Sequence, residues 1–202
     1  QNISNRVMQQ QGYAGIFSLF ITDQSNLAEL MVQDTRLPLI SFTGSVPVGR
    51  RVASAVGQRL GRTLLELSGN NAVIVDDTAD LDMAVRAVLF GAVGTAGQRC
   101  TTTRRLFVHE SRYEQLAGKL VKAYAQVRIG NPLEQDVLLG PLIDQAAVEA
   151  YRAALDEIKK EGGEVLCGGH ALNRPGHFVE PTIVRAQNHW PIVQRETFSP
   201  IL

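Results

Sequence analysis

The sequence predicts an α/β fold with a mainly parallel sheet. Two observations lead to this prediction. Short β-prone runs alternate with helical patterns along most of the chain, which is typical of parallel strands connected by helices. In addition, hydrophobic residues make up 45% of the 202 positions, an ordinary share for a globular protein with a packed core. The composition therefore argues against disorder of the chain as a whole.

The first elements follow from short apolar runs separated by polar residues. Residues 15–20 are expected to form a strand, residues 26–33 a helix, and residues 39–43 a second strand. Gly44 and Ser45 then turn the chain, because these residue types favour turns and helix starts.

An amphipathic helix is expected after this turn, because apolar residues recur every fourth position. These positions are Val48, Val52, Val56 and Leu60. Ser45 is its natural N-cap, and Gly61 is expected to take the left-handed conformation at its C-terminal end. A strand at 63–67 follows, and residues 68–70 break it.

The alternation continues beyond this break. A strand at 72–75 precedes a helix at 81–93 that is rich in small residues, and this pattern ends in the loop that carries Cys100. After a strand at 105–109, the residues SRYE at 111–114 match a capping box ahead of a further helix.

The last predicted elements are a helix and a strand. A helix over 148–158 is ended by Gly162 and Gly163, and a strand starts at 165–167. A domain boundary is expected near Gly69, which divides the chain into residues 1–69 and 70–202.

Composition and charge exclude several classes of function. Twenty basic residues balance twenty acidic ones, so nucleic acid and anionic membranes are not expected partners. No apolar run is long enough to span a membrane, and the four histidines are too scattered for a metal site. The two cysteines have no CxxC spacing, which suits a reduced, cytoplasmic protein. Without an initiator Met or a polar tail, both ends are expected to be cut from a longer chain.

Cys100 and Glu66 are the candidate catalytic pair. A thiolate attacks carbonyl carbon well, and a carboxylate can take a proton from water, so together they suffice for a route through a thioester. Taken alone, a single cysteine is more often a small buried hydrophobic residue, and a glutamate at a strand end is usually solvated. Likewise, Ser45 alone is an ordinary N-cap, although free N–H groups at that helix end could hold a phosphate.

Four motifs, in this order and at these spacings, resemble the aldehyde dehydrogenase superfamily. They are Phe42-Thr43-Gly44-Ser45, Leu65-Glu66-Leu67-Ser68-Gly69-Asn70, Gly97-Gln98-Arg99-Cys100 and Arg195-Glu196-Thr197-Phe198-Ser199-Pro200. The wider block around Cys100 looks most like the antiquitin branch, the α-aminoadipic semialdehyde dehydrogenases. One departure is Ser68, which stands where the family commonly has glycine.

The resemblance implies part of a Rossmann-like cofactor-binding domain in residues 1–69, followed by most of an α/β catalytic domain in residues 70–202. It implies oxidation of an aldehyde to the acid through a Cys100 thiohemiacetal and thioester, with Glu66 activating the water that hydrolyses the thioester. The cofactor implied is NAD, with NADP left open. The cofactor-binding residues would be Gly44, Ser45, Val48, Gly49, Leu67, Glu196 and Phe198.

The resemblance also implies a substrate and an assembly. Arg99 and Thr101 would bind the substrate, and Arg99 would hold the distal carboxylate of a semialdehyde; the alternative for Arg99 is a loop arginine that pairs locally. The parent enzyme would be a homotetramer or homodimer. Because family residues of the oxyanion hole and adenosine site are not in the sequence, the 202-residue chain alone is expected to be inactive. Two alternatives stay open: a non-catalytic piece that self-associates, and a thiol-dependent esterase.

Overall fold

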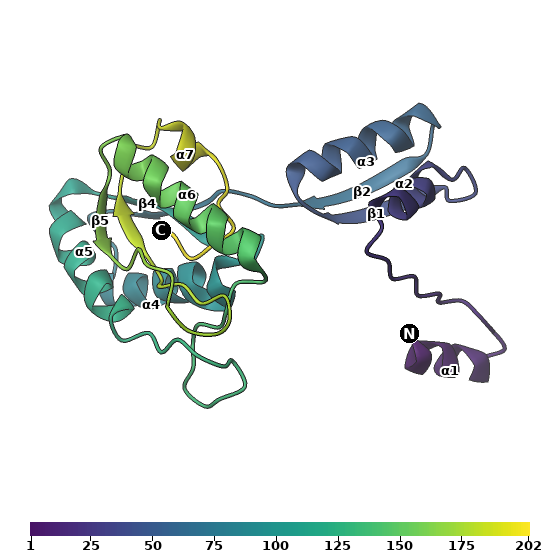
Figure 1. Cartoon of the computed structure of the whole chain (residues 1–202), viewed down its shortest axis with the longest axis horizontal. Helices are drawn as coiled ribbons and strands as arrows, with labels where there is room; N and C mark the ends of the chain where they lie inside the picture. The colour runs from purple at the N-terminus through teal and green to yellow at the C-terminus, as the bar shows by residue number, and fades with distance from the viewer. The chain divides into compact units, whose positions relative to one another are not determined.

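The computed structural model describes residues 1–202, and they divide into two compact units, Gln1–Leu67 and Ser68–Leu202. The two units together contain helices and strands throughout, as expected for an α/β protein (Figure 1). The assignment of residues 1–69 to a cofactor-binding domain and 70–202 to a catalytic domain stays a prediction.

The first unit is a parallel strand pair with helices. Its elements are α1 (Asn2–Gln10), α2 (Ser25–Gln33), β1 (Leu39–Gly44), α3 (Val46–Gln58) and β2 (Arg62–Leu67). Strand β1 pairs in parallel with β2, so that Leu39 lies opposite Arg62 and Gly44 opposite Leu67. A small core forms because Val52 and Val56 of α3 pack with Ile40 of β1. The amphipathic helix predicted after Ser45 is thus present as α3.

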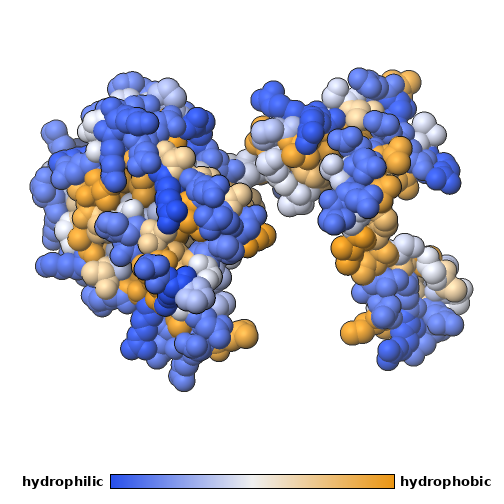
Figure 2. All heavy atoms as spheres, in the orientation of Figure 1, coloured by the Kyte–Doolittle hydropathy of each residue, from blue (hydrophilic) through white to orange (hydrophobic).

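The strand expected at 15–20 does not form. This segment is part of the extended connection between α1 and α2 (Figure 1). Instead of pairing with a strand, the Phe17 N–H donates to Asn5 Oδ1 at 2.9 Å, and the Phe17 carbonyl accepts from the Gln1 and Asn5 side chains at 2.7 Å each. The β-prone segment is therefore extended but does not pair with another strand. Its hydrophobic side chains are exposed to solvent (Figure 2).

The C-terminal end of α3 is shifted by one residue from the prediction. The left-handed residue is Leu60, with φ 57°, and not Gly61. The Leu60 N–H donates to the Gly57 carbonyl and the Gly61 N–H to the Val56 carbonyl, which is the Schellman pattern. Leu60 therefore occupies the position that glycine usually takes.

The second unit begins with a parallel strand pair. It contains β3 (Asn71–Val75), α4 (Leu81–Val93), the 3-10 helix η1 (Gly94–Gly97), β4 (Thr103–Val108), α5 (Glu110–Tyr124), α6 (Gln145–Lys160), β5 (Glu164–Cys167), β6 (Ile183–Arg185) and α7 (Pro191–Gln194). Strands β3 and β4 are parallel, whereas β5 and β6 are antiparallel. The main core joins α4, α5 and α6 through fully buried residues such as Val88, Leu116 and Tyr151. None of the helices in the chain is both long and apolar enough to cross a membrane.

The start of α5 differs from the predicted capping box. The helix begins at Glu110, and His109 is its N-cap, accepting from the Ser111 N–H at Nδ1. The helix therefore begins before the serine, because an imidazole nitrogen can accept the same hydrogen bond as a hydroxyl.

Candidate functional site

Cys100 lies in a turn directly after η1, with an exposed, free thiol. The three residues Thr95, Ala96 and Gly97 all have left-handed backbones, with φ of 57°, 53° and 71°. Two non-glycine residues in this conformation store strain that the surrounding contacts must balance. The Cys100 loop, residues 94–102, therefore has a defined backbone conformation that its contacts maintain.

Gly97 brings this loop against the C-terminal segment. A Cβ atom at Gly97 would lie 2.3 Å from the carbonyl carbon and oxygen of Ser199 and 2.6 Å from the nitrogen of Pro200. Only a residue without a side chain permits this approach. The loop with Cys100 and the segment with Glu196 and Phe198 are therefore in backbone contact.

Asn71, at the start of β3, fixes the backbone around the thiol. Its side-chain Nδ2 donates to the Cys100 carbonyl at 2.6 Å and to the Thr102 carbonyl at 3.0 Å. Within the loop, the Arg99 N–H donates to Thr102 Oγ1 at 3.2 Å. These hydrogen bonds hold the backbone on both sides of the Cys100 side chain.

Arg104, on β4, is a buried charge at the base of this loop, with only 2% of its side chain exposed. Its Nη2 donates to the carbonyls of Gly97 and Arg99 at 3.2 and 3.1 Å, and to Glu196 Oε1 at 2.9 Å. Its Nε donates to the Gly69 carbonyl at 3.3 Å. Burial lowers the pKa of the Arg104 guanidinium, and the Glu196 carboxylate opposes that shift.

Glu196 is held through one of its two oxygens. Besides the bond from Arg104, the Ser68 hydroxyl donates to the same atom, Oε1. Phe198 lies close by, with its ring 5.3 Å from the Arg104 guanidinium carbon and a left-handed φ of 45°. Oε2 of Glu196 accepts neither of these two bonds.

Arg99 makes local contacts in the structure. Its Nη2 donates to the Phe90 carbonyl of α4 at 3.1 Å, and its guanidinium carbon lies 5.1 Å from the Phe90 ring centroid. Its Nε is buried without an acceptor. Thr101, next to the thiol, is exposed. The local pairing weighed as the alternative for Arg99 is thus present, and its role as a substrate residue stays a prediction.

The remaining candidate residues belong to the first unit. Glu66 is exposed on β2 and lies opposite Thr43 in the strand pair, whereas Cys100 belongs to the second unit. Ser45 precedes α3 as its N-cap, but its hydroxyl makes no capping hydrogen bond. The first turn of α3 therefore keeps unpaired N–H groups and has no acidic side chain.

Close packing shapes this end of α3. A Cβ at Gly49 would lie 2.4 Å from a methyl group of Leu67, and one at Gly44 would lie 2.5 Å from the Phe42 ring. Val48 packs against the small core. The unpaired backbone N–H groups in the first turn of α3 could donate hydrogen bonds to an anionic group such as a phosphate.

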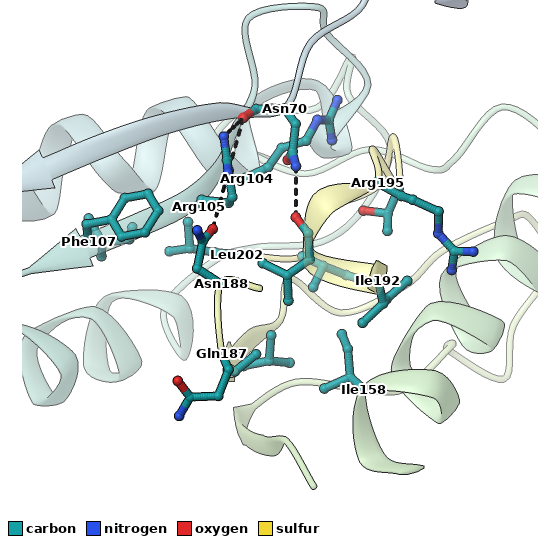
Figure 3. A pocket seen from close by; sticks show the side chains of 16 residues that line it. Asn70, Arg104, Arg105, Phe107, Ile158, Gln187, Asn188, Ile192, Arg195 and Leu202 are labelled. Carbon is teal, nitrogen blue, oxygen red and sulfur yellow. Dashed lines mark hydrogen bonds between the residues drawn. The ribbon is translucent and has the colours of Figure 1, made fainter. Parts of the chain in front are cut away.

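One cavity of the second unit is lined by Arg104 but by no residue of the Cys100 loop. It measures about 320 Å³ and is lined mainly by β4, α7 and the C-terminal segment. At its edge Arg105 donates to the Asn70 carbonyl at 2.8 Å and to Asn188 Oδ1 at 3.2 Å (Figure 3). None of the predicted site residues lines it. No group of three or more His, Cys, Asp or Glu side chains in the chain is arranged to hold a metal ion.

Sequence reasoning missed three residues of this site: Ser68, Asn71 and Arg104. Ser68 appears above only as a departure from the glycine that is common in the family, and Asn71 directly follows the second of the four motifs. Arg104 had one available indication, namely a charged residue inside an otherwise β-prone run.

Comparison with known proteins gives a consistent result. The chain matches the model described as "Aldehyde dehydrogenase family" over residues 6–202. It is 55% identical over 177 residues to a putative aldehyde dehydrogenase family 7 member A1 homolog of Dictyostelium discoideum, covering 87% of this chain and 35% of that one. It is 49% identical to an α-aminoadipic semialdehyde dehydrogenase of Bos taurus, covering 98% of this chain and 37% of that one.

The solved structures show the same fold. A betaine aldehyde dehydrogenase of Staphylococcus aureus in complex with NAD+ matches with a TM-score of 0.91 at 28% identity, covering 98% of this chain and 40% of that one. The chain thus spans about two fifths or less of the length of these relatives.

Proposed function

Because the chain belongs to the aldehyde dehydrogenase family, we propose that it supplies the thiol of an enzyme that oxidises an aldehyde to a carboxylic acid with NAD. The observation that carries this proposal is the exposed Cys100 thiol on a strained loop that is packed against the segment with Glu196 and Phe198. A nucleophile on a rigid loop beside a cofactor-binding carboxylate fits aldehyde oxidation.

Cys100 would act as the nucleophile. Its Sγ attacks the aldehyde carbon and forms a thiohemiacetal, whose oxygen is stabilised by N–H groups of the loop. NAD, when bound, supplies the hydride acceptor, and loss of the hydride from this adduct leaves a thioester on Cys100. Glu66 then takes a proton from water, which attacks the Cys100 thioester, so that the carboxylic acid leaves and the thiol is restored.

Seven residues are proposed to bind the dinucleotide. Ser45 and the amides at the start of α3 bind the pyrophosphate, and Gly44, Val48, Gly49 and Leu67 shape that surface. Glu196 would accept hydrogen bonds from ribose hydroxyls, and Phe198 would form a wall beside the nicotinamide. The NAD+ complex of the Staphylococcus aureus relative supports NAD as the cofactor, with NADP as the alternative.

The proposed substrate is a semialdehyde such as α-aminoadipic semialdehyde. Relatives from Bos taurus and Mus musculus carry that activity in their names, at 49% and 47% identity. Arg99, directly before the nucleophile, would hold the distal carboxylate and Thr101 would contact the chain, since a guanidinium matches a carboxylate bidentately. We propose a cytoplasmic homodimer or homotetramer for the enzyme as a whole.

The test is NAD-dependent oxidation of α-aminoadipic semialdehyde by the protein that its gene encodes. Cys100→Ser is expected to lower kcat/KM by about 1,000-fold or more, because the attacking atom is lost. Cys167→Ser should leave the rate within about threefold, because Cys167 lies in β5 and not in the Cys100 loop. The 202-residue chain by itself, which spans 35 to 37% of the two curated relatives compared above, is expected to oxidise aldehydes negligibly. Equal loss in both variants would contradict the proposal.

A further inference from the structure

We propose that Arg104 is a positioning residue that joins the Cys100 loop and Glu196 into one hydrogen-bonded unit. The roles of Cys100 and Glu196 in this inference rest on the proposed function, whereas the coupling itself rests on geometry. Arg104 makes no hydrogen bond with the Cys100 thiol, so it would act through the groups that it holds.

A single guanidinium reaches three segments that are far apart in sequence. It binds Gly69 before β3, Gly97 and Arg99 in the Cys100 loop, and Glu196 near the C-terminus, all at 2.9 to 3.3 Å. With 2% of the side chain exposed, water does not compete for these bonds. Their geometry therefore fixes the loop relative to the carboxylate.

The Glu196 carboxylate stabilises the buried charge of Arg104, and this ion pair orients the carboxylate. A buried cation is strongly unfavourable without an anionic partner, and Nη1 of Arg104 is buried without an acceptor. Glu196 Oε1 is the only carboxylate oxygen that the guanidinium contacts. Since Oε1 also accepts from Ser68, the carboxylate is oriented with Oε2 free.

A separate set of contacts joins the same two segments. Gly97 lies against the Ser199 backbone, and the Phe198 ring stacks near the Arg104 guanidinium at 5.3 Å. Lysine would keep the positive charge but lacks the planar fork that reaches carbonyls and carboxylate together. Arg104 is therefore the side chain that ties the loop carbonyls to the Glu196 carboxylate, in addition to the Gly97–Ser199 backbone contact.

The first test measures amide hydrogen exchange in residues 97–102 of the 202-residue chain. Arg104→Gln is expected to accelerate exchange there about tenfold or more, because two loop carbonyls lose their donor. The matched control is Arg195→Gln, which breaks the exposed Arg195–Glu157 pair next to Glu196 without touching the loop. Exchange in 97–102 should stay unchanged in that control. Equal exchange in Arg104→Gln and wild type would overturn the proposal.

The second test is a double-mutant cycle with Glu196→Gln in the active protein, scored by the NAD dissociation constant and by kcat. Arg104→Gln should weaken NAD binding and lower kcat by up to about 100-fold, because loop and carboxylate are misplaced. The double variant should lose little more than the worse single variant, because the two residues act as a unit. Fully additive losses would contradict the coupling.

A third variant separates positioning from folding and from charge. Arg104→Lys keeps the buried cation beside Glu196, so its melting temperature should stay closer to wild type than that of Arg104→Gln, while loop exchange and kcat remain impaired. Full recovery with lysine would overturn the positioning role. If no aldehyde is oxidised but the exchange results hold, the proposed function fails and the coupling stands. If oxidation is found and exchange is unchanged, only the coupling fails.

Discussion

At the scale of single residues, the two cysteines occupy opposite environments. Cys100 is exposed on its loop, whereas Cys167 is partly buried in β5 and packs against the core. Burial raises the pKa of the Cys167 thiol, which lowers its thiolate fraction at any given pH. The thiol that the proposed chemistry needs is therefore also the accessible one.

This contrast predicts selective alkylation. Iodoacetamide at pH 8 should modify Cys100 at least about tenfold faster than Cys167, because Cys100 is exposed, whereas Cys167 is partly buried and burial raises its pKa. Peptide mass spectrometry over a time course gives the two rates. Cys100→Ser should remove the fast phase and Cys167→Ser should keep it; a fast phase on Cys167 would contradict the described burial.

Tyr151 predicts how stability depends on alkaline pH. Burial raises its pKa to about 12, and its hydroxyl bonds to the Glu180 carbonyl and to Thr182 Oγ1. The folded state thus keeps a proton that the unfolded state loses from about pH 10 upward. Stability should be unaffected by this group below pH 10 and fall as pH rises from 10 to 12, by about 2 to 3 kcal/mol.

Urea unfolding at pH 9, 10 and 11 measures this loss. Tyr151→Phe removes the titrating group, so its unfolding free energy should fall less steeply with pH than that of wild type. Burial also raises the pKa of Tyr124, so part of the slope will remain in the variant. Equal slopes in wild type and Tyr151→Phe would show that Tyr151 titrates normally.

At the scale of elements, the Cys100 loop depends on the glycine at its tightest contact. Gly97→Ala should destabilise the chain by about 1 to 3 kcal/mol, because the added Cβ meets the Ser199 backbone and φ is 71°. Gly118→Ala is the control: it lies inside α5 with nothing within 4 Å, so alanine should stabilise by about 0.5 to 1 kcal/mol. The denaturant midpoint should fall in Gly97→Ala and rise in Gly118→Ala. An unchanged midpoint in Gly97→Ala would contradict the contact with the Ser199 backbone.

The end of α3 gives a second prediction for an element. Leu60 takes the left-handed position with 93% of its surface exposed, so its side chain adds little packing to offset the strain. Leu60→Gly should raise the free energy of unfolding by about 1 kcal/mol. A lower denaturant midpoint in this variant would show that Leu60 makes stabilising contacts that its exposure does not suggest.

The elements also show what the sequence can predict. The helix predicted at 81–93 matches α4, because helices are stabilised by local contacts; here the Asp80 side chain caps the helix by accepting from the Asp82 and Met83 N–H groups. The strand at 15–20 failed because a strand needs a partner, and the polar groups of Phe17 bond to side chains of α1 and Gln1 instead. Apolar composition indicates an extended segment but does not supply a neighbouring strand.

At the scale of the whole molecule, the same distinction applies to the site. Cys100 and Glu196 were predicted because each lies in a contiguous motif. Arg104 and Ser68 were missed because their role is a contact with Glu196 across 92 and 128 positions. Such contacts exist only after folding brings distant segments together, so no local pattern shows them.

The proposed chemistry requires Cys100 to form a thioester that Glu66 helps to hydrolyse. The most direct measurement is mass spectrometry of the active protein quenched with acid during turnover of α-aminoadipic semialdehyde and NAD. We predict an acyl group on the Cys100 peptide, absent without NAD and more abundant in Glu66→Gln, since hydrolysis is then slowed. Turnover with no acyl group at Cys100 in wild type or Glu66→Gln, or with an acyl group on Cys167, would contradict it.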